Sequence, residues 1–136
     1  MNGLDEGMYR RLLESSPEGM VLIDALNPDH PVVYANPGFE ALTGYVAADL
    51  LGKNLRLLQG DDRDQDARHR LRESMSRGET CRVLLRNYRK DGTVFWNEVT
   101  VGLASASFCR MPSAFWYASR ASAGFPVSIM MPPMFI

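Results

Sequence analysis

The sequence predicts an α+β domain in which short helices alternate with antiparallel hairpins. Two observations indicate this class. Strand-like runs occur in two pairs, each joined by a turn-forming segment, and helical patterns lie before and between the pairs. The chain has 136 residues, which is enough for one domain with a real hydrophobic core.

The first half of the chain predicts a helix, a hairpin and a second helix. Residues 4–15 place apolar side chains at helical spacing. The runs 19–25 and 31–35 predict two short strands, joined by a loop that contains Asn, Pro and Asp. Asn36, which is followed by proline, is typical of a helix N-cap, and Gly44 is a natural stop for that helix.

The middle of the chain predicts further short helical segments. Residues 46–58 read as small apolar turns. Asp61 or Asp62 can cap a longer helix over roughly residues 63–77, which Gly78 ends.

Two long strands follow, over residues 80–89 and 93–102. The three-residue loop 90–92 suits a hairpin that has glycine in the left-handed region, and this loop pairs Asn87 with Phe95. One face of the hairpin is then apolar apart from two amides, and it consists of Val83, Leu85, Asn87, Phe95, Asn97, Val99 and Val101.

The two amides on this face, Asn87 and Asn97, indicate a polar object inside the core. A buried amide without partners costs about 2–7 kcal/mol. Alternatively, the two amides bond to each other or to the backbone. A two-residue loop at Asp91 and Gly92 would also shift the register and separate the amides onto opposite faces.

The opposite face of the hairpin carries apolar side chains between charges, namely Leu84, Tyr88, Val94 and Trp96. Either the N-terminal helix or a second subunit covers such a surface. The second possibility predicts a homodimer.

Composition argues against several classes of protein. The net charge of -1 shows no bulk bias towards nucleic acid or an anionic membrane, so neither is an expected partner. Cys81 and Cys109 form no CxxC motif and have no metal-ligand spacing with His30 or His69. The first residues lack a signal peptide's apolar core, and no apolar run is long enough to span a bilayer. A cytoplasmic location is the expectation.

Three motifs give a resemblance to a known family. The segment GKNLRLLQGDDRDQ (52–65) closely resembles the signature GxNCRFLQG of the flavin-binding light-oxygen-voltage (LOV) family. NYRKDGTVFWNEV (87–99) and YANPGFEALTGY (34–45) resemble two further LOV motifs, in family order and correctly separated. The resemblance covers residues 17 to about 102. It implies a PAS fold, in which an antiparallel sheet of about five strands and short helices enclose a ligand pocket.

The resemblance also assigns residues that contact a flavin. Asn87 and Asn97 would bond the polar edge of the isoalloxazine ring. Asn54 and Gln59 would hold the ribityl chain or nearby ring atoms.

Arg56 and Arg72 would bind the terminal phosphate of the flavin. Arg68 lies one turn before Arg72 on the same helix face and could join them. Guanidinium groups suit phosphate oxygens, which favours flavin mononucleotide (FMN) over riboflavin. Without the resemblance, the alternative is a solvated, arginine-rich helix face.

The chain departs from the LOV pattern in two places. Leu55 occupies the position of the cysteine whose sulfur bonds to the flavin after blue light, so no covalent adduct can form there. Cys81 and Cys109 do not take that position in the sequence. The family's last strand also supplies a glutamine beside the flavin, whereas the last glutamine here is Gln65. Residues 114–119 could be a strand.

Composition changes at about residue 103, after which there are two arginines and no acidic residues. The expected organisation is a helical cap over 1–16, a PAS/LOV-like domain over 17–120 and a divergent apolar tail over 121–136. The expected function is an FMN-binding sensory domain that signals to a downstream partner without a cysteinyl adduct. The alternative is a flavin-free PAS domain for dimerisation or ligand sensing. No set of catalytic residues predicts an enzyme.

Overall fold

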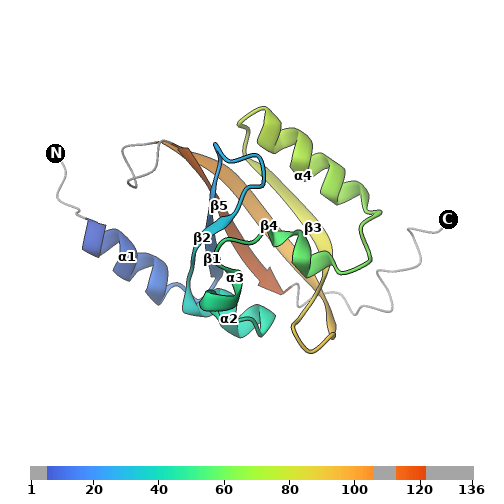
Figure 1. Ribbon diagram of the computed structural model, residues 1–136, viewed down its shortest axis with the longest axis horizontal. Coiled ribbons are helices and arrows are strands. Elements are labelled where there is room, and N and C mark those ends of the chain that lie inside the picture. The colour runs from blue at the N-terminus through green and yellow to red at the C-terminus, as the bar shows by residue number, and fades with distance from the viewer. Residues whose placement is uncertain (1–5, 106–112, 122–136) are drawn as a thin grey trace.

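The computed structural model describes residues 6–105 and 113–121, so Cys109 and residues 122–136 of the predicted tail (121–136) lie outside the described residues (Figure 1). The elements follow the predicted order. They are α1 (Glu6–Ser15), β1 (Gly19–Asp24), β2 (Val32–Ala35), α2 (Pro37–Thr43), α3 (Ala47–Leu50), the 3-10 helix η1 (Leu55–Gln59), α4 (Asp66–Ser76), β3 (Cys81–Tyr88), β4 (Val94–Ser105) and β5 (Ser113–Ala121).

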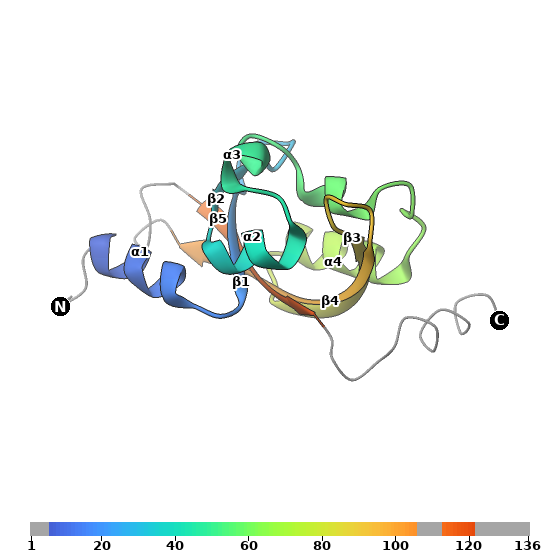
Figure 2. The same ribbon diagram turned by 90° about the horizontal axis from the view of Figure 1, so that it is seen from below.

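The strands form one antiparallel sheet of five strands in the order β2-β1-β5-β4-β3. The last strand in sequence lies at the centre of this sheet, which confirms a strand at residues 114–119 and lengthens it. Strand β4 continues beyond residue 102 because its end pairs with β5. Figure 2 shows α2, α3 and α4 on one side of the curved sheet. This arrangement confirms the predicted α+β fold of the PAS type.

Asn36 caps α2 as predicted, and it also joins three other segments. Its side-chain oxygen accepts hydrogen bonds from the N–H groups of Phe39 (2.9 Å) and Met20 (2.7 Å). Its amide nitrogen donates to the carbonyls of Leu13 (2.7 Å) and Glu18 (3.0 Å). The helix ends at Gly44, whose φ of 79° is left-handed.

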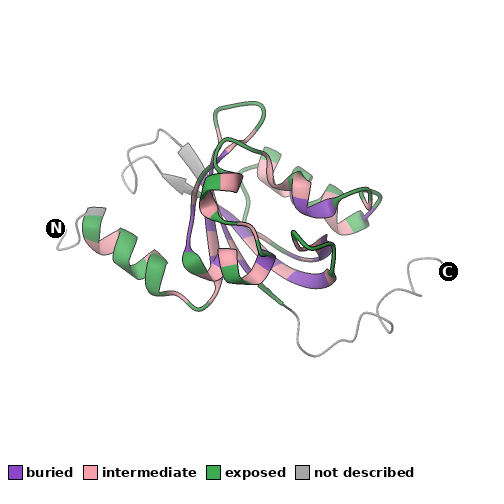
Figure 3. Ribbon diagram, turned by 60° about the horizontal axis from the view of Figure 1, so that its bottom comes forward, coloured by how far each residue is buried: buried purple, intermediate pink, exposed green. Residues whose placement is uncertain are grey.

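The β3–β4 hairpin has the predicted register, with Asn87 opposite Phe95. The loop glycine, Gly92, has a φ of 90°, and the N–H of Arg89 donates to the carbonyl of Thr93 at 2.8 Å. All seven residues of the predicted apolar face are buried. Figure 3 shows this buried band along the strands beneath the helices.

The start of α4 differs from the prediction. The helix begins at Asp66, and neither Asp61 nor Asp62 is its N-cap residue. Instead, the side chain of Gln65 accepts from the N–H of Arg86 (2.9 Å) and donates to its carbonyl (3.1 Å). These bonds hold the segment before α4 extended along the edge strand β3, which cannot happen in a helix. They also pair backbone groups that an edge strand would leave free.

Of the two covers that the sequence left open for the outer face of the hairpin, the N-terminal helix does not provide it. Helix α1 packs against α2 and lies apart from β3 and β4 (Figures 1 and 2). Its Arg10 guanidinium lies 5.6 Å from the centre of the Tyr34 ring. On the outer face, Trp96 is nevertheless only 7% exposed, with the Arg86 guanidinium 5.6 Å from its ring. The homodimer stays a prediction.

Candidate functional site

A cavity of about 660 Å³ lies between the sheet and the segments that cover it. Its walls come from β1, β3, β4 and β5 on one side, and from η1, α4 and the β1–β2 loop on the other. This volume falls within the range of small-molecule sites. All eight predicted site residues line it, namely Asn54, Leu55, Arg56, Gln59, Arg68, Arg72, Asn87 and Asn97.

The two strand amides form a chain of hydrogen bonds at the cavity wall. Asn97 Nδ2 donates to Asn87 Oδ1 at 2.8 Å, and Asn87 Nδ2 donates to the carbonyl of Arg86 at 3.0 Å. The alternative in which the amides bond each other is therefore partly right. However, Asn97 Oδ1 is buried and has no partner among the described residues.

Gln59 presents a second buried acceptor without a partner. Its side chain projects from η1 into the cavity wall, and Oε1 forms no hydrogen bond among the described residues. Each buried polar atom left unsatisfied costs about 1–3 kcal/mol. Two such oxygens in one cavity wall fit a ligand that brings its own N–H or O–H donors.

Asn54 already has partners within the protein. Its Oδ1 accepts from the N–H of Arg56 at 2.8 Å and caps η1. Its Nδ2 donates to the carbonyl of Asp29 at 2.7 Å, so that it ties η1 to the β1–β2 loop. Asn54 therefore shapes the wall, and its contact with a ligand stays a prediction.

Leu55 lines the cavity as the first residue of η1, so the position that lacks a thiol does lie at the site. Cys81, the one cysteine among the described residues, belongs to β3 and is not among the lining residues.

Three arginines from two elements gather at the exposed side of the cavity. Arg56 belongs to η1, and Arg68 and Arg72 to α4. None of them forms an ion pair with a described residue. Partial burial, together with the positive charges of Arg72, Arg63 and Arg56, lowers the pKa of Arg68. Guanidinium groups crowded without carboxylates fit a multiply charged anion such as a phosphate.

Sequence reasoning missed Arg63, which stands close to this cluster. Its Nε donates to the carbonyl of Gly60 at 3.1 Å, and its own carbonyl accepts from Arg68 at 3.2 Å. The sequence places Arg63 at the start of the predicted helix 63–77, whereas α4 begins at Asp66.

Sequence reasoning also missed the cavity-facing residues of β5, which are Phe115, Tyr117 and Ser119. They are buried at every second position of the strand, and that alternation is the signal that could have found them. No glutamine stands among them. Burial raises the pKa of Tyr117, so its hydroxyl stays protonated.

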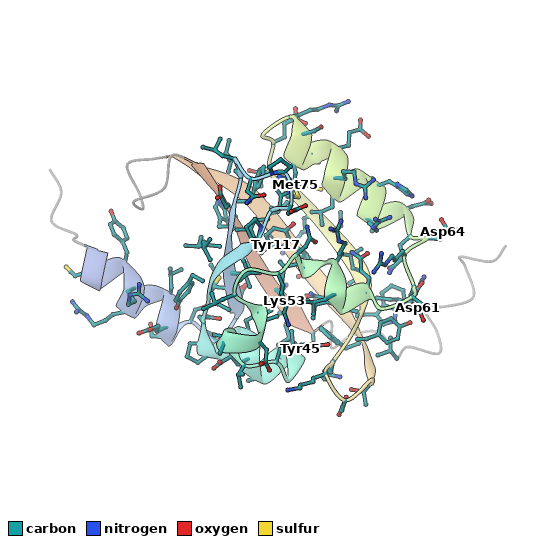
Figure 4. The ribbon with its side chains drawn as sticks, in the orientation of Figure 1. Tyr45, Lys53, Asp61, Asp64, Met75 and Tyr117 are labelled. Atoms are coloured by element: carbon teal, nitrogen blue, oxygen red, sulfur yellow. The ribbon has the colours of Figure 1, made fainter. Side chains whose placement is uncertain are left out.

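Tyr117 reaches from the sheet to α4, where its hydroxyl contacts Met75 Sδ at 3.1 Å (Figure 4). The described residues contain no group of three or more His, Cys, Asp or Glu side chains placed to bind a metal ion. None of the helices within residues 6–105 and 113–121 has the length and apolar character needed to cross a bilayer.

An antiparallel sheet that closes a cavity with short helices defines a sensory domain of the PAS class. A PAS domain family model matches residues 17–108. A blue-light photoreceptor of Listeria monocytogenes is 42% identical over 91 residues, which are 67% of this chain and 36% of that protein. The chain thus spans about a third of the length of this relative.

Two solved LOV domains are similar in both sequence and structure. The LOV domain of a blue-light activated histidine kinase from Erythrobacter litoralis is 30% identical, with a TM-score of 0.71, over 78% of this chain and 96% of that domain. The Aureochrome1 LOV domain is 32% identical, with a TM-score of 0.72, over 93% and 98% of the two chains. The chain belongs to the LOV family of PAS domains.

Proposed function

We propose that this domain binds FMN non-covalently and serves as a sensory module that signals without a cysteinyl adduct. The observation that carries the proposal is the pair of buried oxygens, Asn97 Oδ1 and Gln59 Oε1, that have no partner within the described part of the chain. They lie in a cavity bordered by arginines that form no ion pair with a described residue. A flavin would supply N–H and hydroxyl donors for the oxygens and a phosphate for the arginines. When bound, it would also supply blue-light absorption and one-electron chemistry.

Different residues bind the ring and the phosphate of the flavin. Asn87 and Asn97 orient the ring through their amides, and Gln59 contacts the ring or the ribityl chain. Arg56, Arg68 and Arg72, with Arg63 nearby, balance the phosphate charge. A rearrangement of the Asn87 amide would alter the carbonyl of Arg86, which Gln65 also contacts, and so reach the edge of the sheet.

The decisive test is the content of protein purified from flavin-replete cells. We expect a yellow protein that releases about one FMN per chain on heating or acidification, because no covalent bond holds the ligand. Chromatography of the released material separates FMN from riboflavin. A colourless protein that also takes up no flavin on refolding would exclude the proposal.

Removal of one phosphate contact should distinguish the two flavins. Arg72→Ala is expected to weaken FMN binding by about 1.5–3 kcal/mol, because a charge-assisted hydrogen bond is lost. Riboflavin binding should change little, since riboflavin has no phosphate. Titration of apoprotein with each flavin measures both effects.

Arg70→Ala is the matched control, because Arg70 lies on the same helix but does not line the cavity. It should leave both affinities unchanged. Equal weakening of FMN and riboflavin by Arg72→Ala would instead assign Arg72 a role in packing or helix stability.

A flavin-free PAS domain that senses another ligand is the second candidate. Two observations favour it. Tyr117 projects into the cavity, and Ser119 is found on the strand where the family resemblance calls for a glutamine. The absorption spectrum separates the candidates, since only the first gives a flavin band.

A further inference from the structure

Tyr117 stands on the floor of the cavity, and the register of the sheet places it relative to the amides. Strand β4 presents Asn97, Val99 and Val101 to the core, and Ser119 and Tyr117 of β5 pair with the latter two. The floor therefore runs from Asn97, past Val99 and Ser119, to Tyr117, whose strand partner Val101 does not line the cavity. Four residues along a strand span about 13 Å. A planar ligand whose polar edge lies at Asn97 meets Tyr117 at its other end.

The phenol of Tyr117 does not lie flat within the sheet. It crosses from β5 to α4, where its hydroxyl contacts Met75 Sδ, and the side chain is only 8% exposed. Met75 and Tyr117 both line the cavity, so their contact joins the sheet to α4 at the cavity wall (Figure 4). A thioether is a weak hydrogen-bond acceptor, and methionine is a flexible side chain. The Tyr117 phenol can therefore be displaced from Met75 at a modest cost in free energy.

We propose that Tyr117 determines which ring system the cavity accepts, by opposing the third ring of a flavin while leaving room for a two-ring ligand. This inference rests on the proposed function, because it takes the ring edge to be held by Asn87 and Asn97. The protein binds a flavin only after the phenol has moved from its seat against Met75. Only a small fraction of the molecules has the phenol displaced at any time. The apparent affinity for flavin equals the intrinsic affinity multiplied by that fraction.

The test compares two probes that share a ribityl chain and a pyrimidinedione edge. Riboflavin has three fused rings, and its bicyclic counterpart ribityllumazine lacks the benzenoid ring. Tyr117→Ala should raise the affinity for riboflavin by about tenfold or more, since the obstructing ring is gone. The affinity for ribityllumazine should change by less than about threefold, because that ligand ends short of Tyr117. Titration of the apoprotein, followed by fluorescence, measures both constants.

Two further variants test the inference in case Tyr117→Ala does not fold. Met75→Ala leaves Tyr117 in place but gives its ring space to move, so it should also favour riboflavin selectively. Tyr117→Phe removes only the contact with sulfur and should give a small gain. Thermal unfolding without ligand should show that Tyr117→Ala is less stable than the natural protein although it binds riboflavin better. A merely structural tyrosine would lower stability and affinity together.

The outcomes separate this inference from the proposed function. Riboflavin binding that is unchanged or weaker in both Tyr117→Ala and Met75→Ala overturns the inference and leaves FMN binding intact. An equal gain for both probes also overturns it, because the effect would not depend on the third ring. If Tyr117→Ala binds flavin and the natural chain does not, the inference stands and the proposed function fails. If neither probe binds to any variant, both fail.

Discussion

Leu55→Cys is expected to give the FMN-loaded protein a reversible loss of visible absorption after blue light. Leu55 lines the cavity at the start of η1, where the LOV family resemblance places the reactive cysteine. A thiol at this position would stand beside the ring. It would supply the sulfur that the light-driven adduct needs and that the natural chain lacks at residue 55. The natural protein should instead fluoresce and undergo slow photoreduction. Absorption spectra recorded before illumination, after it and during dark recovery measure the difference.

The substitution should leave the fold intact. Leucine is larger than cysteine, and the smaller side chain leaves a void that costs about 1–3 kcal/mol. Leu57→Cys is the matched control, because Leu57 belongs to the same 3-10 helix but is not among the cavity-lining residues. It should introduce a thiol without any bleaching.

Two results would contradict this expectation. A yellow Leu55→Cys protein that never bleaches would show that residue 55 does not face the reactive part of the ring. Reversible bleaching of the natural protein would require another thiol, Cys81 or Cys109, to reach the flavin.

Asp62→Ala is expected to destabilise the protein by about 3 kcal/mol, because it removes the carboxylate that accepts two hydrogen bonds from the buried Arg86 guanidinium. Asp62 accepts from Arg86 Nε at 2.5 Å and from Arg86 Nη2 at 2.7 Å, and Tyr88 donates to the same carboxylate at 3.0 Å. The Arg86 side chain is only 4% exposed, so solvent screens its charge poorly. Denaturant unfolding, with and without flavin, measures the change.

The neighbouring Asp61 supplies the control for this measurement. It is exposed and forms no ion pair with a described residue, so Asp61→Ala should change stability by less than about 0.5 kcal/mol. Replacement of both Asp62 and Arg86 by apolar residues should recover part of the loss, because no buried charge then remains. A double variant as unstable as Asp62→Ala would show that the ion pair is not the cause.

The same ion pair predicts a dependence on pH. Hydrogen bonds from Arg86 hold the pKa of Asp62 below its usual value. A carboxyl with a lowered pKa contributes its stability above the unfolded pKa of about 3.9 and loses it as the pH falls through the folded value. The difference between Asp62→Ala and the natural protein should therefore shrink below about pH 4.

Local rules account for what could be predicted of the fold. The structure adopts the three-residue loop 90–92 with a left-handed Gly92, which is one of the two loops that the sequence allowed, and the resulting register places Asn87 and Asn97 on one face. Asn36 and Gly44 bound a helix through capping bonds that lie within a few residues of each other. Six of the eight site residues lie in motifs that resemble the LOV family, whereas Arg68 and Arg72 lie on the helix that follows the motif 52–65.

The remaining features depend on contacts between distant segments. Gln65 and Asp62 form hydrogen bonds with Arg86, which lies 21 and 24 residues further along the chain. These hydrogen bonds override the local preference for an earlier start of α4. Trp96 is buried on the outer face, although helix α1, one of the two covers that the sequence left open, packs against α2.

The amino-acid sequence by itself determined the family, the paired amides, the arginines and the absence of a thiol at residue 55, because these follow from residue type and short-range spacing. Only the tertiary structure decided what else enters the cavity. Strand β5 pairs with β4 and β1, and this long-range register turns Tyr117 and Ser119 inward. Contact between Tyr117 and Met75 then requires β5 and α4, which are distant in sequence, to pack against the same space.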